Sequence, residues 1–283
     1  MDISYINGQF LPSNEISISP DDRGFLFADG IYEVVRWYEG DFFDMEGHLL
    51  RLKRSLRELR IIWPTADGFP SLANELIIRN SLQQTPSLLY IQVTRGVAKR
   101  SHSFPSPAVS PTIYAFARGI TPDPDKIAAG IRTIMKNDIR WARCDIKSVS
   151  LLPNILSFQD AVEEESHECI FVKDGIITEC AHSNVFFVKN GTVYTHPESE
   201  SILSGITRKN VIRLARQSGI PVTETAITEK DIPLVDEVFI TNTSFEVAPV
   251  ISINNNPVSD GKPGHITISL RTLFRNETMK LKT

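Results

Sequence analysis

The amino-acid sequence predicts an α+β protein built from two domains. At 283 residues, with 41% hydrophobic and 23% charged residues, the chain is long enough for two ordinary cores. Helical and strand-like patterns both recur along its length without a strict strand–helix repeat. The segment Thr121-Pro122-Asp123-Pro124 holds two prolines too close together for a regular element, so we place the domain boundary near residue 120.

The first domain, residues 1–120, is expected to be a small α+β unit. The pair Asn7-Gly8 lies between two short apolar runs and predicts a hairpin. Leucines at helical spacing predict a helix over residues 46–60, which Pro64 ends. The other expected elements are strands over 30–38, 88–94 and 112–117 and a helix over 72–84.

The second domain, residues 121–283, is expected to be larger and to contain a barrel-like sheet. Tight turns such as Lys173-Asp174-Gly175 separate short strands, which favours a mixed or barrel-like sheet over repeated strand–helix–strand units. The expected elements are strands over 131–135, 168–172, 184–188 and 237–241 and helices over 154–165 and 207–217.

Composition excludes several classes of protein. A net charge of −4 and an isoelectric point near 5.9 argue against a nucleic-acid partner. No apolar run approaches the ~20 residues that span a bilayer, and the first residues lack the pattern of a secretory signal. Three widely spaced cysteines make a disulfide framework or a metal site improbable, so we expect a cytoplasmic protein without a metal.

One lysine stands out because of its neighbours. Lys147 lies between Ile146 and the largely apolar run 149–152, a setting that can bury the amine and favour its neutral, nucleophilic form. Schiff-base chemistry requires a neutral lysine amine. The alternative is a structural ion pair with Asp138 or Asp145, which is the commoner role of a lysine.

Two segments offer groups that bind a phosphate. Gly205 and Thr207 open a predicted helix whose amide hydrogens and dipole attract an anion, although an ordinary N-cap explains Thr207 equally well. Arg51 is flanked by leucines, which suggests a charge held near the interior and suited to a phosphate. The alternative is an arginine that extends along the helix edge to solvent.

Two further segments suit an aromatic cofactor and its substrate. Glu179 follows an apolar strand, where a carboxylate can hold a pyridine nitrogen protonated; an exposed turn glutamate is the commoner case. Arg100 and His102 lie on a basic loop that can bind a carboxylate or simply be solvated. Together these groups supply an amine, a phosphate site, a partner for a ring nitrogen and a carboxylate site.

The order of these segments resembles a known family. The motifs of P-loop proteins, dinucleotide-binding folds, serine hydrolases and zinc proteases are missing from the sequence. Over nearly its whole length the chain resembles the fold-type IV pyridoxal-phosphate transaminases, and within them the bacterial D-amino-acid (D-alanine) aminotransferases. The segments that carry the resemblance are 22–24, 29–35, 48–52, 92–96, 100–105, 138–148, 204–208 and 241–246.

The resemblance implies an activity and a fold. The activity is transfer of the amino group of a D-amino acid such as D-alanine to 2-oxoglutarate, in a ping-pong cycle between pyridoxal 5'-phosphate and pyridoxamine phosphate. The fold is a two-domain α+β architecture, with a small α/β sandwich domain, a larger pseudo-barrel domain and the cofactor between the two. A homodimer is implied as well, because in the resembled enzymes part of the substrate site comes from the neighbouring subunit.

The resemblance also implies a role for each candidate residue. Lys147 forms the Schiff base with the cofactor and moves the proton between the substrate Cα and the cofactor C4′, while Glu179 pairs with the ring nitrogen. The remaining cofactor contacts are Leu203 for the ring and Arg51, Ile206, Thr207 and Thr243 for the phosphate. The substrate carboxylate is received by Tyr32, Arg100 and His102.

One segment departs from the family pattern. After the strand-end glutamate the family has a small run rich in glycine and serine, whereas this chain has Cys180-Ala181-His182-Ser183. We expect His182 either to crowd the face of the cofactor or to offer a new hydrogen-bond donor. Either effect alters substrate size and rate more than the type of reaction. For Cys180 we expect an inert buried thiol.

Two alternative functions stay open. The first is a branched-chain L-amino-acid or (R)-amine transaminase, or an aminodeoxychorismate lyase, of the same fold; these enzymes lack the carboxylate-binding loop in this form. The second is a catalytically silent relative that serves as a binding or scaffold protein. The presence of Lys147, Glu179 and Arg51 argues against the second alternative.

Overall fold

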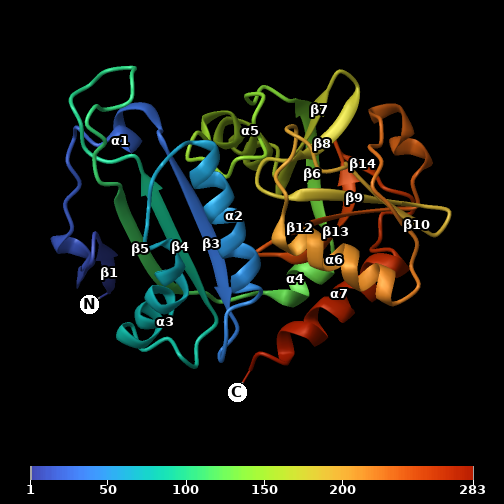
Figure 1. Cartoon of the computed structure of the whole chain (residues 1–283). Helices are drawn as coiled ribbons and strands as arrows, with labels where there is room; N and C mark the ends of the chain where they lie inside the picture. Colours follow the sequence, from blue (N-terminus) through green and yellow to red (C-terminus); the bar gives the residue numbers. More distant parts are fainter. Residues whose placement is uncertain (1, 283) are drawn as a thin grey trace. The chain divides into compact units, whose positions relative to one another are not determined.

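The computed structural model describes residues 2–282. The chain forms two compact units. The first consists of residues up to Thr121, the short segment Ile146–Ser150 and the chain end from Met279 on. The second consists of Pro122–Asp145 and Leu151–Thr278. Figure 1 labels the helices and strands of both units.

The first unit contains an antiparallel sheet with the strand order β2-β1-β5-β4-β3. The predicted hairpin is confirmed, since Asn7 and Gly8 both have positive φ angles, 46° and 96°, as a tight hairpin turn requires. The strands are β1 (Ile3–Ile6), β2 (Gln9–Pro12), β3 (Gly30–Trp37), β4 (Ser87–Thr94) and β5 (Thr112–Gly119).

Two helices cover one face of this sheet, α2 (Met45–Glu58) and α3 (Phe69–Arg79) (Figure 1). The predicted helix over 46–60 is confirmed, and Asp44 caps it by accepting a hydrogen bond of 3.0 Å from the Gly47 amide. The second predicted helix, expected over 72–84, spans residues 69–79 instead. Its earlier start is explained by Pro70, which suits the first turn of a helix. The short helix α1 (Arg23–Phe27) was not predicted.

The second unit contains a mixed sheet with the order β11-β10-β9-β12-β13-β6-β7-β8, and β14 pairs with β13. Strand β6 runs parallel to both β7 and β13. The strands are β6 (Ile131–Asn137), β7 (Glu168–Lys173), β8 (Ile176–Cys180), β9 (Asn184–Lys189), β10 (Thr192–Thr195), β11 (Val222–Thr223), β12 (Glu237–Asn242), β13 (Glu246–Ile253) and β14 (Asn256–Pro257).

This sheet curls around its own apolar core. Strand β8 and strand β9 are separated in the strand order, yet Cys180 of β8 and Val185 of β9 belong to one buried cluster. Residues of β6, β7, β12 and β13 complete the same cluster. Side chains from so many strands share one interior only when the sheet bends back on itself, as the barrel-like prediction requires.

Four α-helices are found in the described part of the second unit, namely α4 (Pro124–Ala128), α5 (Leu152–Glu163), α6 (Ile206–Gln217) and α7 (His265–Met279), whose last residue belongs to the first unit. The predicted helices over 154–165 and 207–217 are confirmed as α5 and α6. Helix α4 begins inside the proline segment, with Pro124 in its first turn. Helix α7 was not predicted.

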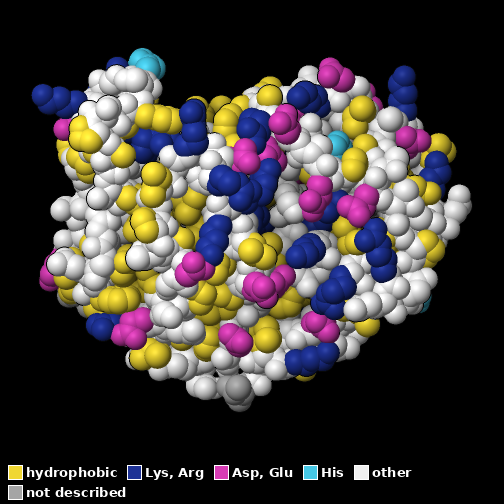
Figure 2. Space-filling model, viewed as in Figure 1, with side chains coloured by type: hydrophobic (Ala, Val, Ile, Leu, Met, Phe, Trp, Pro, Cys, Tyr) yellow, Lys and Arg dark blue, Asp and Glu magenta, His cyan; other side chains and the backbone are white. Residues whose placement is uncertain are grey.

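Surface charge is mixed on the side of the molecule in view. Figure 2 shows Lys and Arg side chains interspersed with Asp and Glu side chains on this face. Such a distribution agrees with the small net charge of −4 and differs from the continuous basic surface of a nucleic-acid-binding protein.

Phe239 provides a test of the second unit's packing. Its ring is fully buried and stacks on Phe186 at a centroid distance of 4.7 Å. Phe239→Ala should lower the free energy of unfolding by about 3–5 kcal/mol, because it removes buried apolar surface and leaves a cavity. Urea denaturation monitored by circular dichroism measures the change. The control is Phe25→Ala, whose side chain is 78% exposed and should alter stability little; equal effects of the two variants would contradict the packing.

Candidate active site

Lys147 is held beside strand β3 by backbone hydrogen bonds within the first unit. The Tyr32 amide donates to the Lys147 carbonyl and the Val149 amide donates to the Gly30 carbonyl, each at 3.0 Å. The Lys147 amide itself donates to Ser55 Oγ of α2 at 3.3 Å. The side chain is half-buried, and its Nζ lies 4.2 Å from the centroid of the Tyr32 ring. The structure therefore brings two of the predicted site residues, Lys147 and Tyr32, into contact.

Arg51 is held by a buried carboxylate. Glu33 is fully buried on the helix-covered face of the sheet, and it accepts hydrogen bonds from Arg51 Nε at 2.7 Å and Nη2 at 2.8 Å. His48 Nδ1 lies 2.8 Å from the same carboxylate. Burial alone would raise the pKa of Glu33, but the charge and hydrogen bonds of Arg51, with the bond from His48, lower the pKa well below its usual range. The two parallel bonds fix the direction of the guanidinium.

Arg100 and His102 lie on an exposed loop of the first unit. The Arg100 guanidinium carbon is 5.1 Å from the centroid of the Phe27 ring, and the His102 ring is 5.6 Å from it. Arg23 is buried and anchors this loop by donating from Nη1 to the Ser101 carbonyl at 2.6 Å. The contacts of Arg100 and His102 are thus with Phe27, and their side chains face solvent.

Glu179 is buried at the end of β8 in the second unit. Its carboxylate accepts hydrogen bonds from Arg140 Nη1 at 2.5 Å, from Asn184 Nδ2 at 2.9 Å and from the Leu203 amide at 3.1 Å. Burial raises the pKa of Glu179 to about 7, although Arg140 and the Leu203 amide act in the opposite direction. The structure thereby brings together Glu179 and Leu203, to which the family resemblance assigns contacts with the same cofactor.

Arg140 forms ion pairs with two carboxylates, Glu179 and Asp138, so its positive charge does not act on Glu179 alone. Asp138 accepts from Arg140 Nε at 2.9 Å and from Nη2 at 2.8 Å, while Nη2 also donates to the Ser201 carbonyl at 3.1 Å. The guanidinium carbon of Arg140 lies 4.6 Å from the centroid of the Phe171 ring. These contacts fix the guanidinium from several directions and hold its Nη1 edge toward Glu179, while one face lies over Phe171.

The start of helix α6 presents amide hydrogens without a side-chain cap. Its N-cap residue is Gly205, which supplies no capping side chain to Ile206, Thr207 or the amide that follows. A Cβ at Gly205 would lie 2.0 Å from Asn184 Oδ1, so a larger residue would displace the side chain that donates to Glu179 and to the Leu203 carbonyl. Ile206 and Thr207 are both buried.

A buried hydroxyl of β12 is a second polar group near this helix start. Thr241 is cross-strand neighbour to Asn184, and its Oγ1 is buried without a hydrogen-bond partner among residues 2–282. Buried polar atoms are nearly always paired. An orphaned hydroxyl next to an uncapped helix start fits an anion such as a phosphate, which accepts hydrogen bonds from both.

Thr243 lies on the turn that follows β12. Asn242 Oδ1 shapes this turn by accepting from the Ser244 amide at 2.9 Å and from the Phe245 amide at 2.6 Å. Asn242 Nδ2 also donates to Ser183 Oγ at 2.9 Å. The turn that carries Thr243 is therefore joined to the turn that follows Glu179.

Sequence reasoning gave no role to Arg140, Asn184, Glu33 or His48. For Glu33 a signal existed, because it occupies a core-facing position between Ile31 and Val35 of an apolar strand, where an unpaired charge is not tolerated. Arg140 lies inside the segment 138–148 that carried the family resemblance, but its spacing gives no indication of which carboxylate it meets.

Cys180 matches the expectation of an inert thiol. It is 1% exposed, and burial raises the pKa of the thiol well above its usual value. The described residues contain no cluster of three or more His, Cys, Asp or Glu side chains suited to a metal ion. Within residues 2–282, every helix is too short or too polar to cross a membrane.

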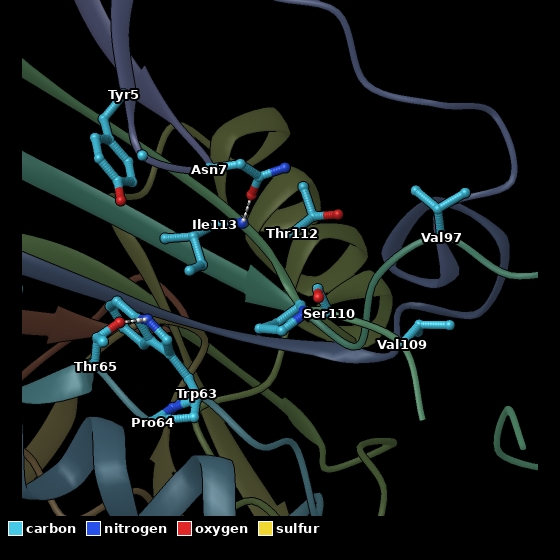
Figure 3. A pocket seen from close by; sticks show the side chains of 12 residues that line it. Tyr5, Asn7, Trp63, Pro64, Thr65, Val97, Val109, Ser110, Thr112 and Ile113 are labelled. Carbon is cyan, nitrogen blue, oxygen red and sulfur yellow. Dashed lines mark hydrogen bonds between the residues drawn. The ribbon is translucent and has the colours of Figure 1, made fainter. Parts of the chain in front are cut away.

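A separate hollow of about 590 Å³ lies in the first unit (Figure 3). Figure 3 shows Tyr5, Trp63 and Val109 around it, with the Asn7 side chain bonded to the Ile113 amide. None of the predicted site residues lines this hollow, so it is distinct from the groups described above.

The sequence is similar to those of one family of known proteins. The chain matches the family model for amino-transferase class IV over residues 30–253. It is 41% identical over 271 residues to a D-alanine aminotransferase of Staphylococcus haemolyticus, with 95% of each chain covered. It is 37% identical over 274 residues to a D-alanine aminotransferase of Bacillus licheniformis, with 96% of each chain covered.

Solved structures show the same fold. A branched-chain amino acid aminotransferase of Escherichia coli superimposes with a TM-score of 0.91 at 23% identity, covering 100% of this chain and 96% of that one. A fold IV-transaminase of Curtobacterium pusillum superimposes with a TM-score of 0.82 at 20% identity, covering 96% and 93%. The predicted fold-type IV α+β architecture is therefore confirmed.

The raised pKa of Glu179 predicts a pH-dependent stability of the cofactor-free protein. The folded state keeps a proton on Glu179 that the unfolded chain releases above its ordinary pKa of 4.5. This contribution is present in full below pH 4.5 and is lost as the pH rises through about 7. As the pH rises from about 5 to about 8, the wild type should therefore lose up to about 3 kcal/mol of unfolding free energy relative to Glu179→Gln, because glutamine does not titrate.

Urea denaturation across this pH range measures the difference. The control is Glu15→Gln, which alters an exposed carboxylate of the first unit. Parallel stability curves for Glu179→Gln and the wild type would show that Glu179 takes up no proton on folding.

Proposed function

Because the chain belongs to the class IV aminotransferase family, we propose that it transfers the amino group of a D-amino acid, such as D-alanine, to 2-oxoglutarate with pyridoxal 5'-phosphate as cofactor. The observation that carries the proposal is the 37–41% identity to D-alanine aminotransferases over nearly the full length of both chains. The likeness to branched-chain aminotransferases, at 23–24% identity, concerns the fold alone.

The residues of both units suit this cofactor. Bound pyridoxal phosphate supplies an aldehyde that bonds to amines and a ring that withdraws electrons from the substrate carbon. Arg51, Ile206, Thr207 and Thr243 would bind the phosphate, and Leu203 would support the ring. The uncapped start of α6 and the unpaired hydroxyl of Thr241 support an anion at this place.

Lys147 and Glu179 would carry the protons. The Lys147 amine would hold the cofactor covalently until the amine of the substrate displaces it, and the freed amine would then accept the proton of the substrate Cα and return it later in the cycle. Glu179 would hold a proton at the pyridine nitrogen. Glu179 suits this role because it is a buried carboxylate whose charge Arg140 balances only in part. It therefore still favours a positively charged group beside it.

Tyr32, Arg100 and His102 would bind the α-carboxylate of the substrate and set its stereochemistry. The exposure of Arg100 and His102 supports a homodimer in which this loop serves the partner's site. We also propose a division into domains near residue 120, and a cytoplasmic location, which the three unpaired cysteines support.

Lys147→Ala tests the role of the amine. Removing the only group proposed to move the Cα proton should lower turnover of D-alanine by roughly 100- to 10,000-fold. The measurements are pyruvate formation and the change in cofactor absorbance on adding D-alanine. Lys173→Ala, at the exposed end of β7, is the control. Persistence of both signals in Lys147→Ala would reject the assignment.

The variant Arg100→Ala distinguishes a D-amino-acid transaminase from the alternative enzymes of the same fold. Loss of a charged hydrogen bond to the substrate carboxylate should lower kcat/KM for D-alanine by roughly 10- to 100-fold. The reaction of (R)-1-phenylethylamine, which lacks a carboxylate, should be affected less. Lys99→Ala, on the same loop, is the matched control. Unchanged kcat/KM for D-alanine would favour an (R)-amine or branched-chain transaminase.

A further inference from the structure

His182 is held by a fully buried carboxylate in the second unit. Its Nδ1 lies 2.7 Å from Oε2 of Glu168, which is 0% exposed. Glu168 also accepts hydrogen bonds from Ser183 Oγ at 2.7 Å, from the Cys169 amide at 2.9 Å and from the Ala181 amide at 3.1 Å. A carboxylate at hydrogen-bond distance stabilises positive charge on an imidazole.

Two aromatic rings fix the plane of the imidazole. Phe158 of α5 meets the His182 ring edge to face at 5.0 Å, and Phe245 meets it at 5.9 Å. The side chain is nevertheless 42% exposed. His182 is therefore a fixed and accessible group, unlike the buried Glu168 that orients it.

His182 is close in sequence to one of the groups proposed to hold the cofactor and contacts the turn that carries another. It follows Glu179, the proposed partner of the ring nitrogen, by three residues. Phe245, which contacts its ring, belongs to the turn that carries Thr243, the proposed phosphate contact, and Ser183 is bonded to Asn242 of that turn. If these roles hold, His182 faces the space beside the cofactor.

The proposed acceptor, 2-oxoglutarate, carries two carboxylates, whereas Tyr32, Arg100 and His102 account for one. In the second unit, the nearby cation Arg140 is already shared between Asp138 and Glu179. A second carboxylate requires a further cation that is accessible and held in place. His182 is accessible and held in place, and its imidazole is a cation when both ring nitrogens carry a proton.

We propose that His182, oriented by Glu168, binds the side-chain carboxylate of dicarboxylic substrates, D-glutamate and 2-oxoglutarate. This inference rests on the proposed function and names the substrate class that the site prefers. His182 is then a specificity-determining residue, and Glu168 is a positioning residue that acts through it. This role gives a chemical reason for a histidine at position 182, where the family pattern has a small residue.

The test compares a charged substrate with its uncharged near-isostere. In His182→Gln, the ratio of kcat/KM for D-glutamate to kcat/KM for D-glutamine should fall roughly 10- to 100-fold, because a charge-assisted hydrogen bond is lost. His182→Lys retains a cation and should keep the ratio closer to that of the wild type. His265→Gln replaces an exposed histidine at the start of α7 and is the matched control.

Equilibrium binding provides a second readout that does not depend on turnover. Isothermal titration calorimetry of the holoenzyme with glutarate and with glutaramate should show that His182→Gln loses affinity for glutarate selectively. Equal discrimination in His182→Gln and the wild type, by either method, would overturn the inference. Wild-type enzyme that fails to transfer the amino group of D-alanine would instead overturn the proposed function, and the calorimetric comparison would still decide the role of His182.

Discussion

A carboxylate removed from water must be surrounded by hydrogen-bond donors, and the pairing of Glu179 with Arg140 shows what this constraint requires. Glu179 accepts from a guanidinium, a side-chain amide and a backbone amide, and these donors come from separate segments of the second unit. Satisfying one carboxylate therefore fixes the position of Leu203, Asn184 and the strand end itself. Through Asn184 the same constraint extends to Gly205 and the start of α6.

Glu33 meets the constraint in a different way, and the difference separates a carboxylate whose pKa is lowered from one whose pKa is raised. Arg51 binds Glu33 through two parallel bonds and His48 adds a third donor, so the pKa of Glu33 falls well below its usual range. Glu33 thus stays ionised and fixes its arginine. Arg140 is divided between Asp138 and Glu179, so burial dominates and the pKa of Glu179 rises to about 7. Of these two carboxylates, only Glu179 is left with a charge that a further positive group can stabilise.

Local pattern explains which elements the sequence predicts. Helices α2 and α6 were predicted because apolar residues at helical spacing form one continuous face in each. Helix α7 was missed because its first turns, Ile266-Thr267-Ile268, are β-branched and favour strands. Tertiary packing overrides that preference, since Leu270 and Phe274 of α7 are 0% and 1% exposed.

The same distinction holds for the candidate site. Lys147, Arg51 and Glu179 were proposed because a charge beside apolar neighbours is visible in the sequence. Arg140 meets Glu179 across 39 residues of chain, and neither its spacing nor its neighbours indicate that pairing. Partners of this kind are determined by the sheet that brings β8 and the end of β6 together, which only the folded structure shows.

The backbone of Lys147 explains how a flexible side chain is aimed. The segment Ile146–Ser150 pairs with the edge of β3, so the Cα of Lys147 is positioned by hydrogen bonds on both sides rather than by a free loop. The Nζ atom then lies 4.2 Å from the centroid of the Tyr32 ring, a contact that attracts the ammonium form of the side chain by about 0.5–2 kcal/mol. A buried ion pair would anchor the amine far more strongly and leave an unpaired charge whenever the amine moved. A weak aromatic contact restrains the direction of the side chain while allowing its terminal amine to move away from the ring.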